Sequence, residues 1–183
     1  MKYLIGTLEQ GTHAEKAALR YLKNHSGKIV YCQTITEIFN KLRDNKINKG
    51  IIPLVNKASG YVEETLRNLR KYSISIEQSI ELPIEQYLCC LNETKKEDIK
   101  EIISHQQAII QCSKYIQENY KNCRLVNTKN TAYAIKQVSR KKMENSAAIG
   151  PKHTIKKYNL KIISKDISNK RDNSTLFAVV TLS

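Results

Sequence analysis

Apolar residues recur along this chain in two alternating patterns. Short, nearly continuous apolar runs, as in residues 2–7 and 28–34, are each followed by a longer segment whose apolar positions fall three and four residues apart, as in residues 12–25 and 35–47. The first pattern is typical of a buried strand and the second of an amphipathic helix. The alternation continues to Tyr72. This order of elements predicts an α/β fold with a parallel sheet.

The middle of the chain follows a different pattern. Residues 73–92 alternate apolar and polar positions over their first half, which predicts a long, half-buried strand interrupted at Pro83. Strand and helix patterns then alternate again up to a last strand at residues 174–182. We therefore expect two α/β lobes, with the last strand returning to the first. The expected lobes are residues 1–75 with 161–183, and residues 76–160.

The chain is strongly basic, and its charge limits the choice of partner. Its 183 residues carry 31 Lys and Arg against 17 Asp and Glu, a formal net charge of +14. A basic field attracts anions. The lysines are spread over every segment and the tyrosines are scattered, which argues against a nucleic-acid-binding stripe. Most of the charge is attributed to a composition rich in Ile, Asn and Lys, and a small anionic ligand is compatible with it. No apolar run approaches the roughly 20 residues of a membrane span, and the first residues lack a signal-peptide pattern, so we expect a cytoplasmic protein without a membrane partner.

The cysteines do not form a recognisable metal or disulfide pattern. They are Cys32, Cys89, Cys90, Cys112 and Cys123, with no CxxC spacing and no histidine cluster beside them. Zinc and a disulfide framework are both disfavoured, so no metal site is expected. We expect buried, reduced thiols, because free cysteine behaves as a small hydrophobic residue.

Polar turns follow several of the predicted strands. They read GTLEQGT, NKASG, SHQQ, NTKNT and KRDNST, and they begin at residues 6, 56, 104, 127 and 170. Ligands of open α/β sheets bind outside the carboxyl ends of the strands. A ligand pocket is therefore expected at these turns. Within them, His105 is expected to be a structural hydrogen-bonding residue at a helix start, and Arg171 and Asp172 are expected to form a loop ion pair.

Taken in order, these turns resemble the catalytic domain of the prephenate dehydratases. The matching stretches are EQGTHAEKAA, PLVNKASGYVEETL, SHQQAIIQC, NTAYA, AAIG and NSTLF, and together they cover almost the whole chain. The resemblance implies a two-lobed fold like that of periplasmic binding proteins, with the ligand cleft between the lobes. It also implies conversion of prephenate to phenylpyruvate with loss of CO2 and water, without a metal or a cofactor.

The resemblance assigns roles to residues of this chain by position in its motifs. Thr175 is the catalytic candidate, as the hydrogen-bond donor that assists the departing hydroxyl group. The substrate-binding candidates are Asn56, Ser104, Gln107 and Gln111, with Thr12, Thr131 and Asn173 as further contacts. Lys57 is either a partner for a substrate carboxylate or a solvated turn residue. Family members often form dimers, so a homodimer is also expected.

The chain departs from the family pattern at several positions. Val55, Lys57 and Leu176 stand where the family has Glu, Ser and Arg, and the first motif lacks its Gly-Pro. The lost Arg is either a substrate clamp or half of a structural ion pair. The ACT domain that follows the catalytic domain in many members is not expected here.

Two alternatives to a dehydratase stay open. One is a prephenate decarboxylase of the bacilysin type, which also resembles this chain and shares a leucine at the position of Leu176. The other is an inactive relative that binds a small anion. Thr175, Gln107, Gln111 and Asn56 favour the dehydratase. The sequence leaves prephenate and its amino analogue arogenate equally open as substrates.

Overall fold

The structure, a computed structural model, describes residues 3–170 and 172–183 and contains two compact units. Unit 1 comprises the described residues of Met1–Ile84 and Asn173–Ser183, and unit 2 those of Glu85–Asp172. Both units are α/β, as expected. The expected Arg171–Asp172 ion pair lies outside the described residues.

The unit boundaries differ from the expected ones, which fell after residues 75 and 160. Strand β5 (Ile74–Pro83) pairs along its length with the last strand, β11 (Ser174–Leu182), so the segment up to Pro83 belongs to unit 1. Strand β10 (Lys161–Ser164) pairs with β6 (Tyr87–Cys90), so it belongs to unit 2. Long-range pairing sets both boundaries, and the sequence pattern does not reveal the partners of a strand.

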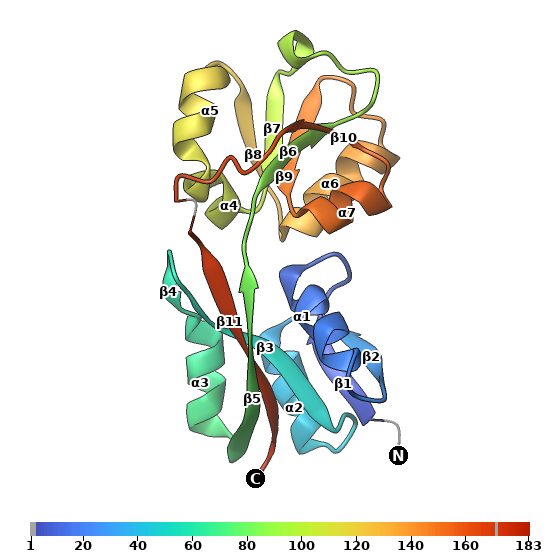
Figure 1. Ribbon diagram of the computed structural model, residues 1–183, viewed down its shortest axis with the longest axis vertical. Helices are drawn as coiled ribbons and strands as arrows, with labels where there is room; N and C mark the ends of the chain where they lie inside the picture. Colours follow the sequence, from blue (N-terminus) through green and yellow to red (C-terminus); the bar gives the residue numbers. More distant parts are fainter. Residues whose placement is uncertain (1–2, 171) are drawn as a thin grey trace. The chain divides into compact units, whose positions relative to one another are not determined.

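Unit 1 is built on a mixed sheet with the strand order β2-β1-β3-β11-β5 (Figure 1). Its first three strands are β1 (Tyr3–Leu8), β2 (Gly27–Cys32) and β3 (Lys49–Asn56), and they are parallel. The short β4 (Gly60–Tyr61) pairs with β3. The expected return of the last strand is confirmed, because β11 runs antiparallel between β3 and β5. The carboxyl ends of β1 and β3 and the amino end of β11 therefore meet at one edge of the sheet.

Helices cover both faces of this sheet. They are α1 (His13–Leu22), α2 (Ile35–Arg43) and α3 (Glu63–Lys71). Alternation along β3 sends Ile51 into the core beneath α1 and Ile52 into the core beneath α2. Threonine side chains at positions 12 and 34 cap α1 and α2.

Unit 2 is built on a second mixed sheet, with the order β10-β6-β9-β7-β8. Strands β7 (Glu101–Ser104), β8 (Arg124–Asn127) and β9 (Ser146–Gly150) are parallel, whereas β6 is antiparallel to both β9 and β10. The helices are α4 (Gln106–Gln111), α5 (Ser113–Asn119), α6 (Thr131–Arg140) and α7 (Lys152–Lys157), with a single 3₁₀ turn, η1 (Lys96–Asp98). The turns that begin α4 and α6 therefore lie at the same, carboxyl edge of this sheet.

The five cysteines are all free, and four of them are buried. Burial raises the pKa of the Cys32 thiol to about 11 and that of Cys112 to about 12. The expectation of buried thiols without a disulfide is therefore confirmed for all but Cys123, which is half-buried. Within the described chain, none of the helices has the length and apolar character that a membrane crossing requires.

Candidate active site

Thr175 and Asn56 form a buried polar pair at the sheet edge of unit 1. Thr175 lies directly opposite Asn56 where β11 pairs with β3, and the two residues are 7% and 9% exposed. The Nδ2 atom of Asn56 donates to Thr175 Oγ1 at 2.9 Å. Because Oγ1 accepts in this bond, the Thr175 proton is not used in it, and that proton has no acceptor among the residues described. Thr175 is thus held as a donor with its proton available.

The amide of Asn56 is fully used within unit 1. Its Nδ2 atom also donates to the Ser174 carbonyl at 3.0 Å. Its Oδ1 atom accepts from Ala58 N, Ser59 N and Ser59 Oγ at 3.0, 3.1 and 3.0 Å. These partners on both sides fix which end of the amide faces Thr175. Asn56 is therefore built to orient Thr175 and to hold the turn at residues 56–59.

Three further candidates lie near this pair along the chain or at the same edge. Asn173 is 5% exposed, and its Oδ1 atom is buried without a hydrogen-bond partner among the residues described. Such an orphaned acceptor requires a physical explanation, for example a bound ligand or water. Lys57 is exposed and its backbone N donates to the Ser174 carbonyl at 2.9 Å. The Thr12 hydroxyl donates to Glu9 O at 2.7 Å and accepts from Glu15 N at 3.3 Å, which commits it to capping α1.

The unit 2 candidates differ in burial and in whether their side chains are hydrogen-bonded within the fold. Ser104 has no exposed surface, and its hydroxyl donates to Ile149 O at 2.8 Å, which links β7 to β9 and leaves no proton for a ligand. Gln107 is exposed and Gln111 is half-buried, and they lie one turn apart on α4. Thr131 is half-buried at the first position of α6.

His105 caps α4 through its ring. The Nδ1 atom accepts from Gln107 N at 3.3 Å, so the expected structural role of this histidine is confirmed. Burial lowers the pKa of His105, which favours the neutral ring that the cap requires.

Two of the departures from the family pattern are neighbours in the sheet. Leu176 lies directly opposite Val55 on β3 and opposite Glu81 on β5. Side chains directly opposite each other in an antiparallel pair interact. The apolar pair Val55–Leu176 therefore occupies the two positions at which the family has a glutamate and an arginine.

The sequence did not predict two contacts that shape the unit 1 edge. One is the bond from the Ser59 hydroxyl to Asn56. The other is the bond from Gly11 N to a carboxylate oxygen of Glu15, at 2.6 Å. The second contact had a signal in the sequence, because a threonine followed three residues later by a glutamate is a capping motif.

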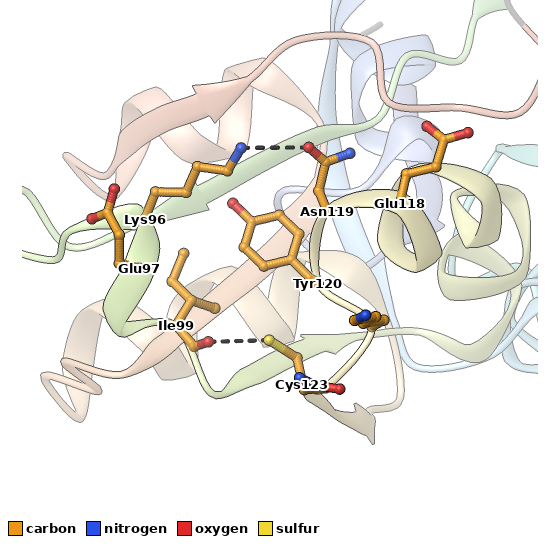
Figure 2. Close-up of a pocket in the computed structure, with 9 residues that line it drawn as sticks. Lys96, Glu97, Ile99, Glu118, Asn119, Tyr120 and Cys123 are labelled. Atoms are coloured by element: carbon orange, nitrogen blue, oxygen red, sulfur yellow. Dashed lines mark hydrogen bonds between the residues drawn. The ribbon is translucent and has the colours of Figure 1, made fainter.

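A separate hollow of about 570 Å³ lies in unit 2, at the amino ends of β7 and β8 (Figure 2). In it, Lys96 Nζ reaches Asn119 Oδ1 at 3.4 Å and lies 5.6 Å from the centre of the Tyr120 ring. Glutamates and lysines both line it. None of the catalytic or substrate-binding candidates predicted from the sequence lines this hollow. The SHQQ turn lies at the opposite end of β7. The candidate catalytic and substrate-binding residues thus lie outside this hollow. Within residues 3–170 and 172–183, no cluster of His, Cys, Asp and Glu is placed to hold a metal ion.

Comparison with known proteins gives a consistent result. The sequence model of the prephenate dehydratase family matches residues 6–183. The chain is 35% identical to the prephenate dehydratase of Methanocaldococcus jannaschii over 182 residues, which cover 98% of this chain and 64% of that protein. The chain thus spans less than two thirds of the length of this relative.

Solved structures agree on the fold. The prephenate dehydratase of Arthrobacter aurescens, solved in complex with L-Phe, superposes with a TM-score of 0.88 at 22% identity, covering 98% of this chain and 60% of that one. A putative methionine-binding lipoprotein of Bacillus subtilis superposes with a TM-score of 0.56 at 13% identity, covering 100% of this chain and 83% of that one. The fold is therefore of the periplasmic-binding-protein type, and the chain belongs to the prephenate dehydratase family.

Proposed function

We propose that this protein converts prephenate to phenylpyruvate, with loss of CO2 and water. The observation that carries the proposal is the bond from Asn56 Nδ2 to Thr175 Oγ1. It leaves a buried hydroxyl proton to donate, at the position that the family motif marks as catalytic. Family membership and the 35% identity to a prephenate dehydratase support the same reaction.

The reaction requires a donor for the leaving group and ligands for two carboxylates. As the ring carboxylate departs as CO2, its electron pair enters the ring and the bond from the ring to the hydroxyl oxygen breaks. Thr175 donates a hydrogen bond to that oxygen as negative charge develops on it, and the group leaves as water with a proton from solvent. Aromatisation of the ring supplies the driving force.

The remaining candidates are proposed to bind the substrate. Lys57, Gln107 and Gln111 carry N–H donors that suit carboxylates, and Lys57 adds a positive charge. Asn56 acts through Thr175. We propose no direct substrate contact for Ser104 or Thr12, because their protons are committed within the fold. Thr131 and Asn173 stay predicted contacts, and a cytoplasmic homodimer stays a prediction as well.

The test is to incubate the protein with prephenate and identify the product by mass and ultraviolet spectrum. Phenylpyruvate is expected. A product that has lost CO2 and kept its hydroxyl oxygen would instead identify a decarboxylase, and unchanged prephenate would refute both reactions. Arogenate, assayed in parallel, tests the amino analogue as substrate.

The role of Thr175 is tested with the isosteric change Thr175→Val. We expect kcat to fall by about 10²-fold or more, because the hydroxyl donor is removed while the shape is kept. Thr175→Ser is expected to retain most of the activity. Thr181→Val, near the other end of β11, is the matched control and should leave kcat unchanged. Equal kcat values for the Thr175→Val variant and the wild type would exclude Thr175 as the donor.

A further inference from the structure

Unit 1 contains the same helix-capping motif twice. The threonine hydroxyls of Thr12 and Thr34 accept from Glu15 N and Glu37 N at 3.3 and 3.0 Å. Each glutamate carboxylate accepts in return from the backbone N of the residue before the threonine, at 2.6 Å from Gly11 and 2.7 Å from Gln33. Both motifs follow a parallel strand of the same sheet and begin a helix.

The two glutamates differ in burial and in their second partner. Glu15 is 6% exposed, and its other oxygen accepts from the Tyr31 hydroxyl on β2. Burial, together with this bond and the charge of Glu15, raises the pKa of Tyr31 to about 12. Glu37 has a side chain that is 36% exposed, and its other oxygen pairs with Lys41 at 3.2 Å on the helix surface. A surface cap is sufficient to start a helix, so the burial of Glu15 is not explained by capping alone.

The turn that Glu15 holds lies at the edge where the polar pair lies. Residues 9–12 follow β1, which pairs with β3, and Asn56 ends β3. Gly11 has a φ of +88°, a left-handed conformation that favours glycine. The Gly11 N–H is bound by Glu15, and Glu15 is bound by Tyr31, so the carboxylate connects the turn, α1 and β2.

We propose that Glu15 is a positioning residue for substrate binding. Its buried carboxylate, shared between Gly11 N and the Tyr31 hydroxyl, holds the turn at residues 9–12 in place at the substrate edge of unit 1. This inference rests on the proposed function. It assigns to Glu15 a task that its counterpart Glu37 does not have.

The experiment compares Glu15→Ala with the matched control Glu37→Ala. Both variants lose a capping bond and are expected to melt at a lower temperature than the wild type. Only Glu15→Ala is expected to raise KM for prephenate, by about tenfold, with a much smaller change in kcat. Amide exchange at Gly11 should accelerate in the same variant.

Two further variants keep the test decisive where Glu15→Ala folds poorly. Glu15→Gln can still accept from Gly11 N and is expected to restore KM to near the wild-type value. Tyr31→Phe removes only the second bond, at a residue that is 41% exposed, and should raise KM by a smaller factor. An active wild type whose KM is unchanged in Glu15→Ala and Tyr31→Phe would overturn the role of Glu15 alone. A wild type without activity on prephenate would instead overturn the proposed function, and the role of Glu15 in it.

Discussion

The polar turns of the two units are organised differently. In unit 1, Asn56 orients Thr175 through a closed set of hydrogen bonds, and both side chains are buried. In unit 2, the buried Ser104 is bonded within the sheet, whereas Gln107 is exposed and Gln111 half-buried at the start and end of a short helix. Unit 1 thus fixes one donor proton, whereas the two amides of unit 2 lie on a short helix, one exposed and one half-buried.

For the proposed reaction, this difference suggests two separate tasks. A group that acts on the breaking bond gains from being fixed in advance, because no reorganisation is then required as charge develops. Groups that recognise a carboxylate that does not react gain less from being fixed, since they bind the substrate and the transition state about equally. We therefore expect substitutions in unit 1 to lower kcat, and substitutions at the amides of unit 2 to raise KM.

The largest effect is expected for Asn56→Asp. The carboxylate of an aspartate at this position cannot donate to Thr175 Oγ1, and it would accept the Thr175 proton that the proposed reaction requires. We expect kcat to fall by about 10²-fold, comparable with the loss of the Thr175 hydroxyl itself.

The control for this change is Ser59→Ala. It removes one of the three bonds to Asn56 Oδ1 and leaves the Asn56 donor in place. Its kcat should stay within a small factor of the wild-type value. An Asn56→Asp variant with wild-type kcat would mean that the orientation of Thr175 does not matter.

A smaller effect, on KM, is expected for Gln107→Ala. Loss of one hydrogen bond from an uncharged amide to a substrate carboxylate should raise KM by about tenfold with little change in kcat. Gln117→Ala, on the neighbouring helix α5, is the matched control and should change neither constant. If Gln107→Ala lowered kcat and left KM unchanged, the division of tasks between the units would be wrong.

The sequence predicted the elements of both units better than their partners. Periodicity and capping residues are local, so α1, α2 and the cap at Thr12 were predictable. The pairing of β10 with β6 was not, because it depends on contacts between distant segments. The same holds for the site: Asn56 and Thr175 are 119 residues apart, and only the fold reveals that one orients the other.

The apolar pair at the unit 1 edge allows a third test, on stability. Val55→Glu alone should destabilise the protein, because it places a carboxylate opposite Leu176 without a partner. Leu176→Arg alone should destabilise the protein less, because the carboxylate of Glu81, directly opposite on β5, can pair with the arginine. The double variant should recover stability by about 0.2–1 kcal/mol relative to the sum of the single changes.

Activity measurements decide what the basic residue of the family does. If the free energies of unfolding show this coupling and kcat/KM changes little, the acid and base of the family form a structural pair. Strong activation by Leu176→Arg without coupling would instead indicate a substrate clamp. Either result resolves the alternative that the sequence left open.

The smallest effect is expected from pH, at the helix start of unit 2. The pKa of His105 is lowered in the folded protein because burial disfavours the charged ring. The contribution of the neutral ring to stability is therefore present above the ordinary histidine pKa of about 6.5, and it is lost as the pH falls through the folded value. Protonation removes the Nδ1 acceptor, so the protection of the Gln107 amide against exchange, relative to an unstructured peptide at the same pH, should decrease in acid. His105→Asn keeps a capping acceptor and cannot titrate in this range, so its exchange should lack this acid-dependent step. Because unit 1 has no histidine in its polar pair, kcat should follow this titration less than KM does, and a titration seen only in kcat would contradict the contrast between the units.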